Sequence, residues 1–236
     1  MRKQLLLLTI PCALALSAFT AITAVRPEAF FKKGNKLTYQ LSSNDTEEKF
    51  YCVFTVHSVT VENGKSTIVV KDQRQYDTRK NQPYVYRLTF YCDSLNWCSD
   101  ALNAIDVDWK SSSKPDEVEL VSDSLVYPFK MQVGDSLPGA SGREITKWNT
   151  GTTERRVFYS KRYVAAKEEV MVGAETVSAF RIESEFKYQK VGSKVQEVTK
   201  MYIEWFEPSR GIVKRELRGI SAKPFIQTYV MIPTGK

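Results

Sequence analysis

The chain has 236 residues, a formal net charge of +7, and a composition that is 42% hydrophobic and 12% aromatic. This length suits one all-β domain or two small lobes, and the hydrophobic content supplies a substantial core. His57 is the single histidine, and it stands in a strand-like segment without a nucleophile motif, an HExxH or a paired CxxC. These features argue against a histidine-based catalytic triad or metal site.

The N-terminus has the layout of a secretory signal peptide. A basic start, Met1-Arg2-Lys3, precedes an apolar run over residues 5–22 and the small pair Thr23-Ala24. We expect residues 1–24 to be removed on export to the periplasm or the extracellular space, leaving residues 25–236 as a single β domain. An uncleaved membrane anchor is the alternative. Loss of Arg2 and Lys3 lowers the net charge from +7 to +5. The remaining positive charge allows contact with a membrane surface, and an ordinary solvated surface is the preferred alternative. An exported protein is not expected to meet nucleic acid.

The first half of the mature chain alternates strand patterns with turn signals. The segment at His57-Ser58 changes parity, which predicts a bulge, and Asn63-Gly64 predicts a tight hairpin. Residues 97–106 are the one place where a short helix is expected, with Ser99 as its cap. Strands are expected at residues 37–41, 50–61, 66–73, 84–90 and 118–126.

The second half begins with a segment that repeats the first. Residues 127–137 and 30–37 share the order aromatic, Lys, Gly, Asn or Asp, any residue, Leu. The repeat indicates two lobes of similar plan, residues 25–126 and 127–236, with coincidence as the alternative. Period-two patterning in the last long segment is typical of antiparallel sheet with one wet face. Strands are expected at residues 143–148, 154–165, 168–173, 178–190 and 226–232.

A hairpin near the C-terminus is the most legible element. Ile203 and Trp205 alternate with polar residues, Pro208 favours a turn, and Gly211 can take the positive φ of a bulged hairpin. The predicted fold class is therefore all-β and antiparallel, as a curled sheet, barrel or half-barrel with at most one or two short helices.

Three cysteines remain in the mature chain. Cys92 and Cys98 are separated by a short segment that can turn back, so a disulfide between them is expected. Cys52 alternates with aromatic residues and is interpreted as a buried apolar filler.

Candidate site residues come from the surplus of aromatic side chains on strands. Tyr84, Tyr86, Phe180 and Trp205 are candidates for lining a ligand site, or they simply fill the core. Carboxylates near an aromatic ring, in Asp106-Val107-Asp108-Trp109, are the basis for a hydrolase alternative. No catalytic residue, metal or cofactor is expected.

Three ordered motifs resemble a known family. They are Val133-Gly134-Asp135-Ser136-Leu137, the segment at residues 169–182, and the Trp205 to Lys214 hairpin. Their order is similar to the TapB-like, DUF3108-like group of secreted β-proteins that are common in Bacteroidetes. The resemblance implies a barrel-like or half-barrel antiparallel fold and an envelope location, and it brings no established activity or catalytic residues.

These observations favour an exported, non-enzymatic envelope protein. We expect it to bind an apolar or amphiphilic ligand, or an envelope protein partner, in the concavity of its sheet. An envelope hydrolase acting on glycans or esters and a structural or assembly scaffold are the alternatives.

Overall fold

The computed structural model describes residues 31–44, 46–63, 65–76, 85–104, 117–192, 195–220 and 226–233. The predicted signal peptide lies outside these ranges. Within them, thirteen strands join one antiparallel sheet, and the chain makes a single 3-10 turn at Ala101–Ala104, which confirms the predicted fold class. The strands are β1 Lys36–Ser43, β2 Thr46–Glu62, β3 Lys65–Tyr76, β4 Val85–Cys92, β5 Asn96–Asp100, β6 Glu117–Ser122, β7 Ser124–Pro128, β8 Ala140–Trp148, β9 Gly151–Val172, β10 Glu175–Val191, β11 Val195–Glu207, β12 Gly211–Gly219 and β13 Ile226–Pro233.

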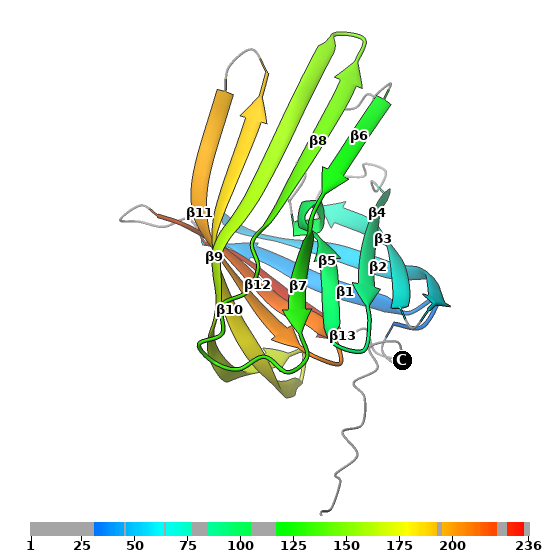
Figure 1. Cartoon of the computed structure of the whole chain (residues 1–236), viewed down its shortest axis with the longest axis vertical. Helices are drawn as coiled ribbons and strands as arrows, with labels where there is room; N and C mark the ends of the chain where they lie inside the picture. The colour runs from blue at the N-terminus through cyan, green and yellow to red at the C-terminus, as the bar shows by residue number, and fades with distance from the viewer. Residues whose placement is uncertain are drawn as a thin grey trace, which may run out of the picture.

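The sheet rolls up until its two ends meet. Its strand order is β6-β8-β9-β10-β11-β12-β13-β1-β2-β3-β4-β5-β7, so β6 and β7 lie at opposite ends. In the chain, however, they are separated by Asp123 alone, and the Asp123 amide donates to the Ser141 carbonyl at 2.8 Å. Figure 1 shows the result, with β6, β8 and β11 projecting above a curled lower part that holds β1, β2, β7 and β13. We call the part of the sheet that closes in this way around the larger hydrophobic core the main roll.

The repeated sequence segment forms the same backbone loop twice, and we call each copy a hook. The Gly34 amide donates to the Val56 carbonyl at 2.8 Å, and the Gly134 amide donates to the Val164 carbonyl at 2.8 Å. Both glycines have positive φ, +89° and +97°, a region that L-residues rarely occupy. The two segments are therefore similar in structure as well as in sequence. Their strands nevertheless belong to one sheet, and the division into two lobes stays a prediction.

The faces of the long strands are buried in two separate cores. The main core fills the main roll and takes Phe180, Ile182 and Phe186 from β10, as the alternation in residues 178–190 predicted. The second core is smaller and lies on the opposite face of β9 to β12. There the sheet also curls, because β9 contacts β13 although three strands separate them in the strand order. The second core consists of Val170, Val172, Ala179, Ile203, Trp205 and Val213.

Several local predictions are confirmed. The register of β2 shifts between Val56 and Ser58, where a bulge was expected. Gly211 has a φ of +80° in the β11–β12 hairpin, whose register shifts between Trp205 and Phe206.

Three element predictions are wrong in detail. The expected helix at 97–106 begins as strand β5, because Trp97 and Ser99 are buried on one face between β4 and β7. The turn that follows starts at Asp100, whose side chain accepts a hydrogen bond from the Leu102 amide. The single strand expected at 118–126 is two strands, since the chain passes from one end of the sheet to the other at Asp123. The break expected between 165 and 168 is absent, because β9 absorbs its irregularities as bulges. In the part of the chain that the structure describes, no helix is long and apolar enough to cross a membrane.

Candidate functional site

The four residues expected to line a ligand site are not gathered in one place. Arg181, not Phe180, is opposite Trp205 across β10 and β11, so Phe180 and Trp205 face opposite sides of the sheet. Phe180 belongs to the main core and Trp205 to the second core. Tyr84 lies outside the described residues, and Tyr86 is placed only as a member of β4 opposite Asp72.

The residues proposed for other chemistry contribute little to the described structure. Asp106, Asp108 and Trp109 lie outside the described ranges. His57 is exposed beside the β2 bulge. Among the residues that the structure describes, no group of three or more His, Cys, Asp or Glu side chains could hold a metal ion.

The predicted disulfide between Cys92 and Cys98 is not formed. In the β4–β5 ladder Cys92 is opposite Trp97, whereas Cys98 is opposite Tyr91. Neighbouring positions on a strand point to opposite faces, so the two thiols lie on different sides of the hairpin. A turn alone would let the two thiols meet, but the residues after the turn form strand β5, paired in register with β4.

A shallow depression lies on the surface beside Cys98. It has a volume of about 350 Å³ and is lined by Tyr91, Asp93, Cys98 and Ser124. Its floor is formed by exposed and half-buried side chains, so a ligand in it would stay in contact with water.

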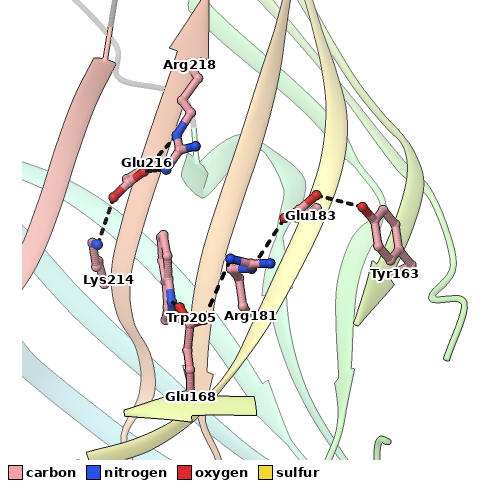
Figure 2. Close-up of polar contacts among 8 residues, drawn as sticks. All are labelled: Tyr163, Glu168, Arg181, Glu183, Trp205, Lys214, Glu216 and Arg218. Carbon is pink, nitrogen blue, oxygen red and sulfur yellow. Dashed lines mark hydrogen bonds and ion pairs between the residues drawn. The ribbon is translucent and has the colours of Figure 1, made fainter. Parts of the chain in front are cut away.

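The first of two polar clusters lies on the face of the second core. We call it the outer ladder, and Figure 2 shows its members, which come from β9, β10, β11 and β12. Trp205 is at its centre: its Nε1 donates to Glu168 Oε1 at 2.5 Å, and the Lys214 ammonium lies 4.1 Å from the ring centroid. Only 4% of Trp205 is exposed, so the ring anchors the second core and offers no platform for a ligand.

The charges of the outer ladder compensate one another. Arg181 pairs with Glu168 at 3.7 Å and with Glu183 at 3.3 Å, and Lys214 pairs with Glu216 at 2.8 Å. Arg218 also pairs with Glu216. Burial by itself would raise the pKa of Glu216, but its hydrogen bonds from both cations hold it below the usual value. The ladder, which comprises Tyr163, Glu168, Arg181, Glu183, Trp205, Lys214, Glu216 and Arg218, is thus a network of compensated charges, in which Arg181 Nε is held by an ion pair and makes no hydrogen bond.

The second polar cluster lies in the main core, where three of its members are buried and the Arg215 side chain is 19% exposed. We call Tyr127, Arg162, Glu204 and Arg215 the inner cluster. Tyr127 Oη donates to Glu204 Oε2 at 2.6 Å, and Glu204, which is fully buried, pairs with Arg215 at 3.3 Å. Burial, followed by the nearby negative charge of Glu204, raises the pKa of Tyr127 well above its usual value. The hydroxyl therefore remains a proton donor to the carboxylate.

Among the residues whose burial is described, Arg162 is the buried cation. It is 2% exposed, its guanidinium lies 5.1 Å from the Tyr127 ring centroid, and its Nη1 donates to the carbonyls of Pro138 at 2.8 Å and Val126 at 3.4 Å. No carboxylate of the described residues pairs with it, and its Nε and Nη2 have no hydrogen-bond partner. Arg162 thus links β7 to β9 across the closure of the main roll, with three of its five N–H donors unused.

Other buried donors near the inner cluster also lack acceptors. They are the Tyr202 hydroxyl, Trp97 Nε1 and the Ser184 hydroxyl. Trp97 packs edge-on against Tyr127 and Phe206, with ring centroids 6.4 and 6.3 Å apart. Buried polar groups without a partner are rare in native proteins and call for a physical explanation such as bound water or a ligand. The interior of the main roll is therefore aromatic, rich in donors and poor in acceptors.

Sequence reasoning missed the inner cluster. Arg162 lies in residues 155–163, where interleaved basic and aromatic residues fit a strand with one charged face, and Glu204 lies on the amphipathic face of its strand, opposite the face of Ile203 and Trp205. The available signal was that Tyr202 and Phe206 flank Glu204 on the same face. Two large aromatic side chains beside a carboxylate favour burial of that face.

The chain resembles known proteins in both sequence and fold. The model of the DUF3108-like family matches residues 32–218. A solved structure from Bacteroides fragilis, described as an exported protein with a YmcC-like fold, has a TM-score of 0.68 at 17% identity and covers 87% of this chain and 97% of its own. A Parabacteroides distasonis structure described as a lipoprotein has a TM-score of 0.69 at 13% identity, covering 85% and 94%. No curated protein matches the chain. Because the family model spans most of the sequence, this chain belongs to the DUF3108-like family.

Proposed function

We propose that this protein is exported to the cell envelope and works there without catalysis, by binding an amphiphilic ligand in the interior of the main roll. The basic start and apolar run of residues 1–24 support export. The two solved structures of similar fold are described as an exported protein and a lipoprotein, which agrees with an envelope location.

The observation that carries the ligand is the state of Arg162. Burying an ionised side chain is costly unless it is paired and hydrogen-bonded. Arg162 is buried, and two of its nitrogens have no partner among the described residues. A polar ligand group beside these nitrogens would satisfy them. The aromatic side chains around it, including Trp97 and Phe206, would then surround the apolar part of the same ligand.

The closure of the main roll offers a route to the interior. Neighbouring strands in the sheet order are joined by ladders. β7 is the last strand of this order, and among the described strands it pairs only with β5. Its other side contacts β8 and meets β9 through the Arg162 side chain, and residues 134–137 bond to the β9 backbone. Separating β7 from β9 would break few backbone hydrogen bonds. Since side chains fill the interior, ligand entry requires this seam to open.

Binding rather than catalysis is supported by how the buried carboxylates are held. Glu144 is bonded by Arg155 and Thr146, and Glu204 by Tyr127 and Arg215. A carboxylate that acts as a general acid or base needs access to the substrate. These carboxylates instead stabilise fixed cations.

The proposal is tested with the purified mature chain and a lipid extract of bacterial envelopes. The protein is incubated with the extract, isolated again, and its bound molecules are identified by mass spectrometry after solvent extraction. We expect an amphiphile to be retained in near-stoichiometric amount, both by the wild type and by Arg218→Met, which removes an exposed cation of the outer ladder. Recovery of protein without any retained amphiphile would refute the proposal.

A second candidate is a protein partner that adds a strand to β6. This strand is at one end of the sheet, and Val118, Leu120 and Val121 are 42%, 61% and 59% exposed. Exposed apolar edge strands are sites for strand addition. A photo-crosslinking residue at Leu120 should capture one discrete envelope protein, whereas the same residue at Val195 on the β10–β11 hairpin should not. Equal labelling at both positions would exclude this candidate.

A further inference from the structure

We infer that the polar end of the ligand is an anion, a carboxylate or a similar planar oxyanion, and that Arg162 is the residue that binds it. This inference rests on the proposed binding function and adds the charge and position of the ligand headgroup. Three independent features of the inner cluster support it.

The first feature is the charge of the inner cluster. It contains two guanidinium groups, those of Arg162 and Arg215, and one carboxylate, that of Glu204. Glu204 is already shared between Tyr127 and Arg215. The cluster therefore has one positive charge in excess within the main core. A singly charged anion restores neutrality, whereas a neutral ligand leaves the charge buried without compensation.

The second feature is which nitrogens of Arg162 are unused. Nη1 is occupied by the carbonyls of Val126 and Pro138. Nε and Nη2, which have no partner, are the two donors on the same side edge of the guanidinium plane. Their N–H bonds are nearly parallel, which matches the two oxygens of a carboxylate in a bidentate pair. A hydroxyl or an ester carbonyl fills only one of these positions.

The third feature comes from the repeated hook. In the first hook Leu37 is opposite Phe54, and in the second the Leu137 amide donates to the Arg162 carbonyl at 2.9 Å. Arg162 thus occupies the position that Phe54 occupies in the first hook. Phe54 packs against the main core as an apolar side chain. The hook therefore forms without a guanidinium, so the charge of Arg162 is not a requirement of the local fold.

The hydroxyl of Tyr202, which lies near Glu204 and Arg215 of the inner cluster, fits the same interpretation. It is buried and has no hydrogen-bond partner, and the Tyr159 ring that packs against it lies within electrostatic reach of Arg162. Burial is the main cause that raises the pKa of both tyrosines. Both remain protonated and neutral, so neither repels an anion.

The test compares palmitic acid with palmityl alcohol, which share one acyl length and differ in the headgroup. Titrations use the mature wild-type chain at a pH at which the acid is ionised. We expect the acid to bind roughly ten- to a hundredfold more tightly, the effect of one bidentate charge-assisted pair. Arg162→Met should abolish this preference, and Arg218→Met should keep it.

The outcomes separate the inference from the proposed function. If the acid and the alcohol bind with equal affinity, the anion inference is wrong and the proposed function stands. If neither binds, the proposed function fails for this ligand class and the inference fails with it. Should Arg162→Met not fold, Arg162→Phe, which copies the first hook, provides the same comparison. A preference for the acid that survives either substitution would assign the headgroup to another residue.

Discussion

Tyr127 and Glu204 are 77 positions apart in the chain, yet the tyrosine hydroxyl donates to the carboxylate at 2.6 Å inside the main core. This bond ties β7, the last strand of the sheet order, to the middle of the sheet. Because both residues are fully buried, water cannot replace either partner. The bond is therefore central both to the closure of the main roll and to the charge of the inner cluster.

Removing this bond should destabilise the protein. Tyr127→Phe keeps the stack on Phe206, whose ring centroid is 5.2 Å away, but deprives buried Glu204 of a donor. We expect the free energy of unfolding in urea to fall by about 1–3 kcal/mol. The matched control is Tyr163→Phe, which removes an exposed bond to Glu183 of the same 2.6 Å length and should cost roughly 0.5 kcal/mol or less. Equal costs for the two variants would contradict the buried geometry.

Alkaline pH should unfold the protein through its buried tyrosines. Burial is the largest cause that raises the pKa of Tyr127, Tyr159 and Tyr202. A tyrosine whose pKa is higher in the folded state contributes stability below its unfolded pKa of about 10, and this contribution is lost as pH rises above that value. Tyrosinate absorbance and circular dichroism should therefore show a late group of tyrosines that ionise together with loss of strand structure. Complete ionisation of all tyrosines in a folded protein would contradict this.

Gly211 is required for two separate reasons. Its φ is +80°, and a Cβ at this position would lie 3.0 Å from Trp97 Nε1. Gly211→Val should lower the free energy of unfolding by more than about 1 kcal/mol, because a β-branched residue resists positive φ. Gly34→Val is the control, since Gly34 has a φ of +89° and a Cβ added there would meet no atom within 4 Å. Gly34→Val should carry the cost of the positive φ but not the contact with Trp97, so it should be the less damaging change. A larger loss of stability for Gly34→Val than for Gly211→Val would show that the Trp97 side chain moves aside at little cost.

Cys92 and Cys98 should not be joined to each other in the mature protein. Their positions opposite Trp97 and Tyr91 put them on different faces of the β4–β5 hairpin, and strand registers do not slip without turning whole faces over. Digestion without reductant should give the Cys92 and Cys98 peptides with no link between the two, as read by peptide mass spectrometry. Recovery of the two peptides joined to each other would show that the register of β5 differs from the one described.

Local patterns predicted the strands and turns better than they predicted which side chains are buried. The Gly34 and Gly134 hooks were visible because each needs a glycine at a fixed distance from a leucine, and β10 was visible because its two faces differ in polarity. The placement of β6 and β7 at opposite ends of the sheet is non-local, and no pattern within residues 117–128 encodes it. Glu204 and Arg162 were missed for a related reason: a charged residue in an alternating strand indicates solvent until the partner that buries it is known.

A crystal structure of the mature chain with palmitic acid tests the central claim most directly. We predict that the carboxylate lies within hydrogen-bond distance of Arg162 Nε and Nη2, with the acyl chain among the aromatic side chains of the main roll. Density for the ligand on the outer ladder or along β6, with water alone at the edge of the Arg162 guanidinium, would contradict it.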